Sequence, residues 1–331
     1  MRLTRWQQRT LRLLCTIALV AGIFWFIPFT EVVAAFRGLH LGYVGAGLVL
    51  IITIAGFEAW QLWILLERAG IPVGPWRVFE TKFITRFYGQ FLPSELLASA
   101  VKLHRLAGPT KQWGEVVAAL AFTRLVNTAT LLLLGVAFWA VEMPAGPGRW
   151  IGLIMIAMIV LLGMLHLVLA SKRVNRHARN ILAMRWFAWL KGKLVDRISR
   201  ITNTAIDSYR LFGGAVWRLT ALALVRHGLG ILSFVLIAMA LDIHLSILTV
   251  GWIRVVLRAV MMLPIHLSGI GVREASLVVL LQEYDVPAGE AVALAFLLFV
   301  IQLIANSMGG VFELKNLLRG KQDESATKAD A

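Results

Sequence analysis

The chain of 331 residues is too apolar for a soluble globular protein, because 59% of its residues are hydrophobic and only 15% are charged. Its mean hydropathy of +0.77 exceeds what one soluble core of this length would hold, so we expect a polytopic membrane protein. The net charge of +15 would suit nucleic-acid binding, but the cations cluster between apolar segments, where they set orientation in a membrane. We therefore expect no nucleic-acid partner.

Six apolar segments are long enough for a helix to cross the ~30 Å hydrocarbon layer of a membrane. They cover residues 11–29, 41–66, 116–141, 150–170, 216–241 and 288–312. We expect helices, since lipid offers no hydrogen-bond partner to the open edge of a strand. The predicted fold is an all-α polytopic membrane protein with about six full transmembrane spans. One integral membrane domain covers residues 1–318, and we expect the polar tail, 319–331, to be disordered.

A strongly basic segment, residues 171–215, separates the two halves of the chain. It holds ten Lys or Arg between Lys172 and Arg210 against only Asp196 and Asp207, and both ends of the chain are basic too. Because positively charged loops remain in the cytoplasm, we place both termini there. Apolar residues at helical spacing favour a cytoplasmic amphipathic helix on the membrane surface. The alternative is a solvated charged hairpin that only fixes topology.

Two stretches 171 residues apart have nearly the same pattern. Leu92-Pro93 lies nine residues before Lys102 in the first, and Leu263-Pro264 lies at the same spacing before Arg273 in the second. Both stretches are apolar enough to lie in a membrane, where an uncompensated charge is expensive. Such a pair is typical of an internal repeat in a transporter.

The charges around these stretches predict two hairpins that enter the membrane from opposite faces. Basic residues flank the first hairpin on both sides, whereas the second lies between loops that we place outside. We therefore expect an inverted repeat of residues 41–141 and 212–312, with re-entrant, broken helices that enclose a cavity near the midplane. Tilted, kinked helices that cross fully are the alternative. The predicted hairpin breaks are Pro93, Pro264, Gly269 and Gly271.

The second hairpin carries a family signature. Residues 263–274, Leu-Pro-Ile-His-Leu-Ser-Gly-Ile-Gly-Val-Arg-Glu, closely resemble the Leu-Pro-x4-Gly-x-Gly-x-Arg-Glu pattern of the lysylphosphatidylglycerol synthase transmembrane-region family, also called flippase-like membrane proteins. Phe122-Thr123-Arg124-Leu125 resembles the arginine that follows the family's first hairpin. The likeness runs from about residue 10 to 318.

The first hairpin departs from the family pattern Leu-Pro-Ser-x-x-Gly-Gly-Asp-x-x-Arg. This chain has Leu97-Ala98-Ser99 in place of Gly-Gly-Asp, and Lys102 in place of the arginine. The change removes one carboxylate and the close backbone approach that paired glycines permit. Glu95, one helical turn away, is the candidate to supply the missing carboxylate.

The resemblance implies lipid translocation. Some relatives flip aminoacylated phosphatidylglycerol, and others accompany glycolipid or isoprenoid-lipid pathways. We therefore expect a translocase of the bacterial inner membrane that moves an anionic phospholipid, an aminoacylated phospholipid or a polyprenyl lipid or glycolipid, with no cofactor or metal.

The alternatives are a scaffold or regulator of a lipid- or glycan-synthesis enzyme, which would bind through the basic segment, and an intramembrane glycosyl- or acyltransferase. The sequence contains no phosphate-loop, zinc-protease or nucleophile-elbow motif, so we expect no enzyme activity.

Charges forced into the membrane are the candidate substrate-binding residues. We expect Lys102 and Arg273 to meet at the repeat interface and to contact a lipid phosphate, with the planar guanidinium making two parallel hydrogen bonds. Arg124 lies inside a span and needs a partner. The further candidates are Arg86, Glu95, Arg258 and Glu274.

Each candidate also has a structural interpretation. Arg273 and Glu274 would satisfy each other, and Arg124 would pair with Glu58 or Asn127. Lys102 would extend to the cytoplasmic interface. Arg254 lies one turn before Arg258 and would extend the cationic path. Arg226 and His227 lie early enough in their span to reach the membrane surface.

Overall fold

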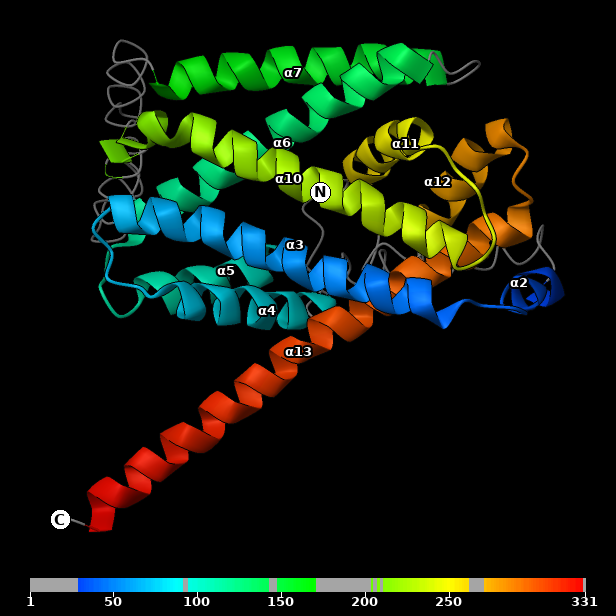
Figure 1. Cartoon of the computed structure of the whole chain (residues 1–331). Helices are drawn as coiled ribbons and strands as arrows, with labels where there is room; N and C mark the ends of the chain where they lie inside the picture. The colour runs from blue at the N-terminus through cyan, green and yellow to red at the C-terminus, as the bar shows by residue number, and fades with distance from the viewer. Residues whose placement is uncertain are drawn as a thin grey trace, which may run out of the picture.

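The computed structural model describes residues 29–91, 95–142, 148–170, 204, 207–208, 211–261 and 271–329. Within these residues all regular secondary structure is helical, which confirms the predicted all-α class (Figure 1). The expected span at 11–29 lies almost wholly outside the described residues, and so do most of the basic segment and the predicted breaks Pro93, Pro264 and Gly269.

Four helices of the described ranges are long and apolar enough to cross a membrane. They are α3 (Leu41–Arg68), α6 (Trp113–Glu142), α10 (Val216–Met239), which extends the 3₁₀ turn η2 (Phe212–Ala215), and the Ala288–Asn316 part of α13 (Ala288–Ala329). All four coincide with expected spans. In α7 (Gly148–Ala170), the described apolar stretch Gly152–Met164 is shorter than a span. α13 continues as helix through most of the tail expected to be disordered.

The remaining helices are short and occur as two consecutive pairs, besides α2 (Phe29–Ala35) at the start of the described chain. The first pair is α4 (Pro75–Phe91) and α5 (Glu95–Ala107), and the second is α11 (Ile247–Val260) and α12 (Val272–Leu281), followed by the 3₁₀ turn η3 (Gln282–Tyr284). At ~1.5 Å per residue, even α4 is only about 25 Å long. In the sequence, Pro93 lies between α4 and α5, and Pro264 lies between α11 and α12.

Local signals explain where these short helices begin. Pro75 is the first residue of α4, a position where its missing N–H costs no hydrogen bond. The Ser246 hydroxyl caps α11 by accepting a 2.9 Å hydrogen bond from the Thr249 N–H. Before α12, Gly271 has a φ of 85°, and its N–H donates to the Glu274 carboxylate at 2.7 Å.

The long helices α3 and α10 lie side by side and run in opposite directions (Figure 1). The His40 N–H donates to the Ala240 carbonyl at 3.0 Å near the start of α3. The Gln61 amide donates to the Leu219 carbonyl at 2.8 Å near its other end. Gly47 lets the helices approach closely, because a Cβ there would lie 2.8 Å from Ile237.

Two further helix contacts are equivalent in the two halves of the chain. Equivalent residues are found by a shift of 171, the spacing of the two similar sequence stretches. α4 packs on α13, and α11 packs on α6; the shift carries α4 onto α11 and α6 onto α13. In each contact, a glycine lets the two helices approach each other closely. A Cβ at Gly309 would lie 2.2 Å from the Phe83 carbonyl oxygen, and one at Gly135 would lie 2.6 Å from Val255. The packing therefore joins each short helix to the long helix of the other half.

Candidate binding cavity

A cavity of about 200 Å³ lies where both halves of the chain meet. Six helices contribute to its wall: α3 and α4 from the first half, and α10, α11, α12 and α13 from the second. Its lining residues are Ile51, Ile54, Arg86, Gly230, Ser233, Phe234, Arg254, Leu257, Arg258, Met261, Arg273, Leu298 and Gln302.

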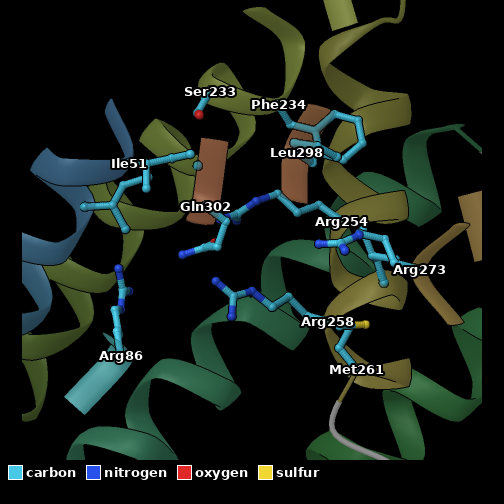
Figure 2. A pocket seen from close by; sticks show the side chains of 13 residues that line it. Ile51, Arg86, Ser233, Phe234, Arg254, Arg258, Met261, Arg273, Leu298 and Gln302 are labelled. Atoms are coloured by element: carbon cyan, nitrogen blue, oxygen red, sulfur yellow. The ribbon is translucent and has the colours of Figure 1, made fainter. Parts of the chain in front are cut away.

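The charged lining residues are all arginines. Arg86, Arg254, Arg258 and Arg273 line the cavity, and none of its described lining residues is acidic. Figure 2 shows the Arg86 and Arg258 guanidinium groups directed from opposite sides toward the same central space, close to the Gln302 amide. Arg258 lines the cavity and is an exposed residue. The cavity is therefore a concentration of positive charge within a largely apolar wall.

Arg86 is held by a carboxylate on the neighbouring helix. Glu58 of α3 accepts a 2.8 Å hydrogen bond from Arg86 Nη2 and a 2.6 Å hydrogen bond from Arg226 Nη1 of α10. It also forms an ion pair with Lys82, one turn before Arg86 on α4. The Glu58 side chain is only 10% exposed. One buried carboxylate thus ties three helices together and orients an arginine of the cavity.

Arg226 and His227 lie in the interior of the protein. Both are buried, with 8% and 4% of their surface exposed. Arg226 Nη2 lies 2.8 Å from His227 Nε2, which lies 3.1 Å from the Asn127 carbonyl oxygen of α6. The antiparallel packing of α3 and α10 places Glu58 opposite Arg226. A carboxylate partner lowers the cost of holding a guanidinium inside a membrane protein.

Arg254 lies against the backbone of α10 at Gly230. A Cβ at residue 230 would lie 2.0 Å from Arg254 Nη2 and 2.3 Å from its Cζ, so the guanidinium occupies the space that a larger residue would fill. Arg254 Nη1 is buried and has no hydrogen-bond partner among the described residues. Because a buried donor without a partner is costly, this nitrogen is suited to meet a ligand oxygen.

Arg273 combines a structural contact with its place in the cavity wall. Its Nη2 lies 3.5 Å from Glu274 Oε1, and its guanidinium stacks over the Phe299 ring at 5.0 Å from the centroid. Glu274 also accepts the hydrogen bond from the Gly271 N–H that begins α12. The pairing of Arg273 with Glu274 is therefore present, and the arginine still lines the cavity.

The structure separates the candidate residues into two groups. Arg86, Arg258 and Arg273 share the cavity, whereas Lys102 and Arg124 are not among its lining residues. Lys102 on α5 interacts electrostatically with Lys82, Glu58 and Arg86, which places it beside the cavity. Arg124 on α6 is exposed. The side chain of Glu95 lies outside the described part of the chain.

Three important residues were missed or undervalued by the sequence analysis: Glu58, Arg226 and Arg254. Glu58 carried the clearest signal, because it is the only charged residue in the apolar run 41–66. A lone carboxylate in a membrane span requires a cationic partner. The pattern could have predicted that partner's existence but not its place on α10.

Comparison with known proteins supports the resemblance seen at residues 263–274. The family model "Lysylphosphatidylglycerol synthase TM region" matches residues 13–310. No curated protein and no solved structure matches the chain. The matched range includes the helices that form the arginine-lined cavity and most of the chain. The protein therefore belongs to the lysylphosphatidylglycerol synthase transmembrane-region family.

Proposed function

We propose that this protein is a lipid translocator that holds the phosphate of an anionic head group in the arginine-lined cavity while the lipid chains remain in the bilayer. The observation that carries the proposal is the meeting of four guanidinium groups from three helices, with no acidic side chain among the described lining residues. The family's membrane and lipid context agrees with this function.

The cost of these charges supports a ligand-binding role. Insertion scales assign about 2.5 to 3.5 kcal/mol to an arginine at the centre of a membrane helix, unless it is paired or hydrated. Two described carboxylates, Glu58 and Glu274, form ion pairs with arginines of the lining, namely Arg86 and Arg273. A planar guanidinium matches two phosphate oxygens at once, so a phosphate group is a suitable ligand for this arginine-lined wall.

The helix arrangement supports a transport architecture. We propose that the two halves form an inverted repeat, with α4–α5 and α11–α12 as re-entrant hairpins that enter from opposite faces. The antiparallel packing of α3 with α10 supports this, and so does the correspondence of the α4–α13 and α11–α6 contacts. A cavity between such halves can open to either side when one half moves against the other.

The remaining features of the proposal follow from the sequence. We place the protein in a bacterial inner membrane with both termini in the cytoplasm, because the basic segments mark the cytoplasmic face. We also propose that the lipid leaves chemically unchanged, so the protein acts without catalysis. Mass spectrometry of lipids incubated with purified protein checks this point, since a transferase would produce a lipid of altered mass.

A lipid-flip assay in proteoliposomes tests the function. Phosphatidylglycerol with a fluorescent acyl chain should cross the bilayer faster with wild-type protein than in protein-free vesicles. Arg258→Gln removes a cavity cation and should bring the rate close to that of protein-free vesicles. Arg218→Gln removes an exposed cation of α10 outside the cavity and should keep the wild-type rate. Equal rates with and without wild-type protein, for every phosphate-bearing lipid tried, would count against transport.

A further inference from the structure

The cavity has a large excess of positive charge, which bears on the kind of head group that it accepts. Two more cations, Lys82 and Arg226, share Glu58 with Arg86 beside the cavity. Among the described residues, the four lining arginines and these two form a group of six cations, and Lys102 lies beside them. Two described carboxylates, Glu58 and Glu274, form ion pairs with members of this group, so cations outnumber carboxylates among the described residues in and around the wall.

Both carboxylates already have several hydrogen-bond or ion-pair partners. Glu58 is shared by three cations, and Glu274 uses its second oxygen for the Gly271 N–H. Arg254 Nη1 is a buried donor without a hydrogen-bond partner in the described part of the chain. A ligand with a single negative charge would leave most of the excess uncompensated in a low-dielectric environment.

We infer that the cavity selects a lipid whose head group carries two or more negative charges on phosphoryl oxygens, as in a phosphomonoester or a diphosphate. The inference rests on the proposed function and narrows its substrate. A phosphomonoester offers three terminal oxygens and a charge of about −1.5 to −2 at neutral pH. A phosphodiester offers two such oxygens and one charge, so it can engage fewer of the four guanidinium groups.

The size of the cavity agrees with a small, highly charged group. Its volume of about 200 Å³ is below the ~300 to 1,000 Å³ of pockets that enclose whole drug-sized ligands. A phosphoryl or diphosphoryl group with some water fits this scale, whereas acyl or isoprenoid chains must stay outside. The apolar lining residues, such as Ile51, Phe234 and Leu298, suit the beginning of such a chain.

The same wall disfavours head groups that carry an ammonium. An ammonium needs a carboxylate, a carbonyl oxygen or an aromatic face, and the described lining offers no carboxylate. Ser233 already donates its hydroxyl proton to the Gly47 carbonyl. Four guanidinium groups would repel a lysyl head group. The aminoacylated lipid in the family's name is therefore a poor ligand for this cavity.

Competition binding with the purified full-length protein in detergent tests this inference. Three lipids with identical acyl chains compete against fluorescent phosphatidylglycerol: phosphatidic acid, phosphatidylglycerol and lysylphosphatidylglycerol. At pH 8, we expect phosphatidic acid to bind at least about tenfold more tightly than phosphatidylglycerol, and lysylphosphatidylglycerol to compete least. At pH 5 the monoester loses most of its second charge, whose pKa is about 6. The preference should then shrink to about twofold or less.

Two variants and two further lipids sharpen the test. Arg254→Gln should reduce the preference for phosphatidic acid, whereas Arg218→Gln should not. If Arg254→Gln does not fold, Gly230→Ala displaces the same guanidinium and provides the second variant. Farnesyl phosphate and farnesyl diphosphate test whether the charged group belongs to an isoprenoid lipid or to a glycerolipid. If either farnesyl compound binds more tightly than phosphatidic acid, an isoprenoid lipid is favoured. If both bind more weakly, a glycerolipid is favoured.

The outcomes separate this inference from the proposed function. Equal affinities for the three glycerolipids at both pH values would overturn the charge selection, and so would the absence of binding by all of them. If phosphatidylglycerol is still translocated in vesicles, the transport proposal survives that result. A clear preference for phosphatidic acid without translocation of any lipid would instead support the binding inference and reject transport.

Discussion

Glu58 and Arg226 form a 2.6 Å ion pair across the contact between α3 and α10, although 168 residues separate them in the sequence. The pair joins the two halves of the molecule. Because Glu58 also binds Lys82 and Arg86 of α4, it links the long helices α3 and α10 to a short helix of the cavity wall. The position of Arg86 in the cavity therefore depends on a residue that does not line it.

Glu58→Gln should destabilise the protein strongly. The amide preserves the shape of the side chain but leaves Lys82, Arg86 and Arg226 without their shared anion in a buried environment. Removing one partner of a buried ion pair typically costs about 3 to 5 kcal/mol. Thermal unfolding of the purified protein measures the loss, and Glu67→Gln, at the exposed end of the same helix, provides the control. Equal melting temperatures for both variants would show that the three cations do not depend on Glu58.

Gly230→Ala should impair lipid binding without loss of fold. The new methyl group would overlap the Arg254 guanidinium, which is the flexible end of a side chain and can move out of the cavity. Helix propensity favours alanine over glycine by about 1 kcal/mol, so stability should not fall by much. Gly228→Ala is the matched control, because a Cβ there meets no atom within 4 Å. The same loss of lipid affinity in both variants would contradict the placement of Arg254.

Gly309→Ala should weaken the contact between α4 and α13. A Cβ at this position would lie 2.2 Å from the Phe83 carbonyl oxygen, a backbone atom that cannot swing aside. Overpacking of this kind usually costs about 1 to 3 kcal/mol. The control is Gly45→Ala on α3, where a Cβ meets nothing within 4 Å. Chemical unfolding of the two variants compares them, and unchanged stability of Gly309→Ala would argue against this helix packing.

The proposed inverted repeat predicts that the two hairpins begin on opposite faces of the membrane. Gly74→Cys and His244→Cys place single thiols at exposed positions just before α4 and α11, in a background with Cys15→Ser. A membrane-impermeant maleimide should label His244→Cys in intact cells and Gly74→Cys only in inverted vesicles. If both thiols react from the same side, the hairpins do not have opposed orientations.

The sequence predicted the long helices well because their signal is local. The apolar runs 41–66, 116–141 and 288–312 are uninterrupted and long, so composition alone locates α3, α6 and the apolar part of α13. Each of these features depends on neighbouring residues in the chain, and none requires knowledge of packing.

The cavity was harder to predict because its members come from six helices. Lys102 and Arg273 have equivalent places in the two sequence stretches, but Arg86 and not Lys102 lines the cavity with Arg273. The difference arises because Glu58, on a different helix, binds Arg86 and orients it. Arg254 enters the wall only because Gly230 leaves room for it on α10. Long side chains adopt positions set by such distant neighbours.

Chemical protection of individual arginines tests the central claim most directly. Purified protein is treated with an arginine-specific dicarbonyl reagent, with and without phosphatidic acid, and peptide mass spectrometry measures the modification of each site. The account predicts that the lipid protects Arg258, which is exposed in the cavity, and leaves Arg218, exposed on α10 outside it, fully reactive. Equal modification of Arg258 with and without lipid, at concentrations that saturate binding, would show that the phosphate does not occupy this cavity.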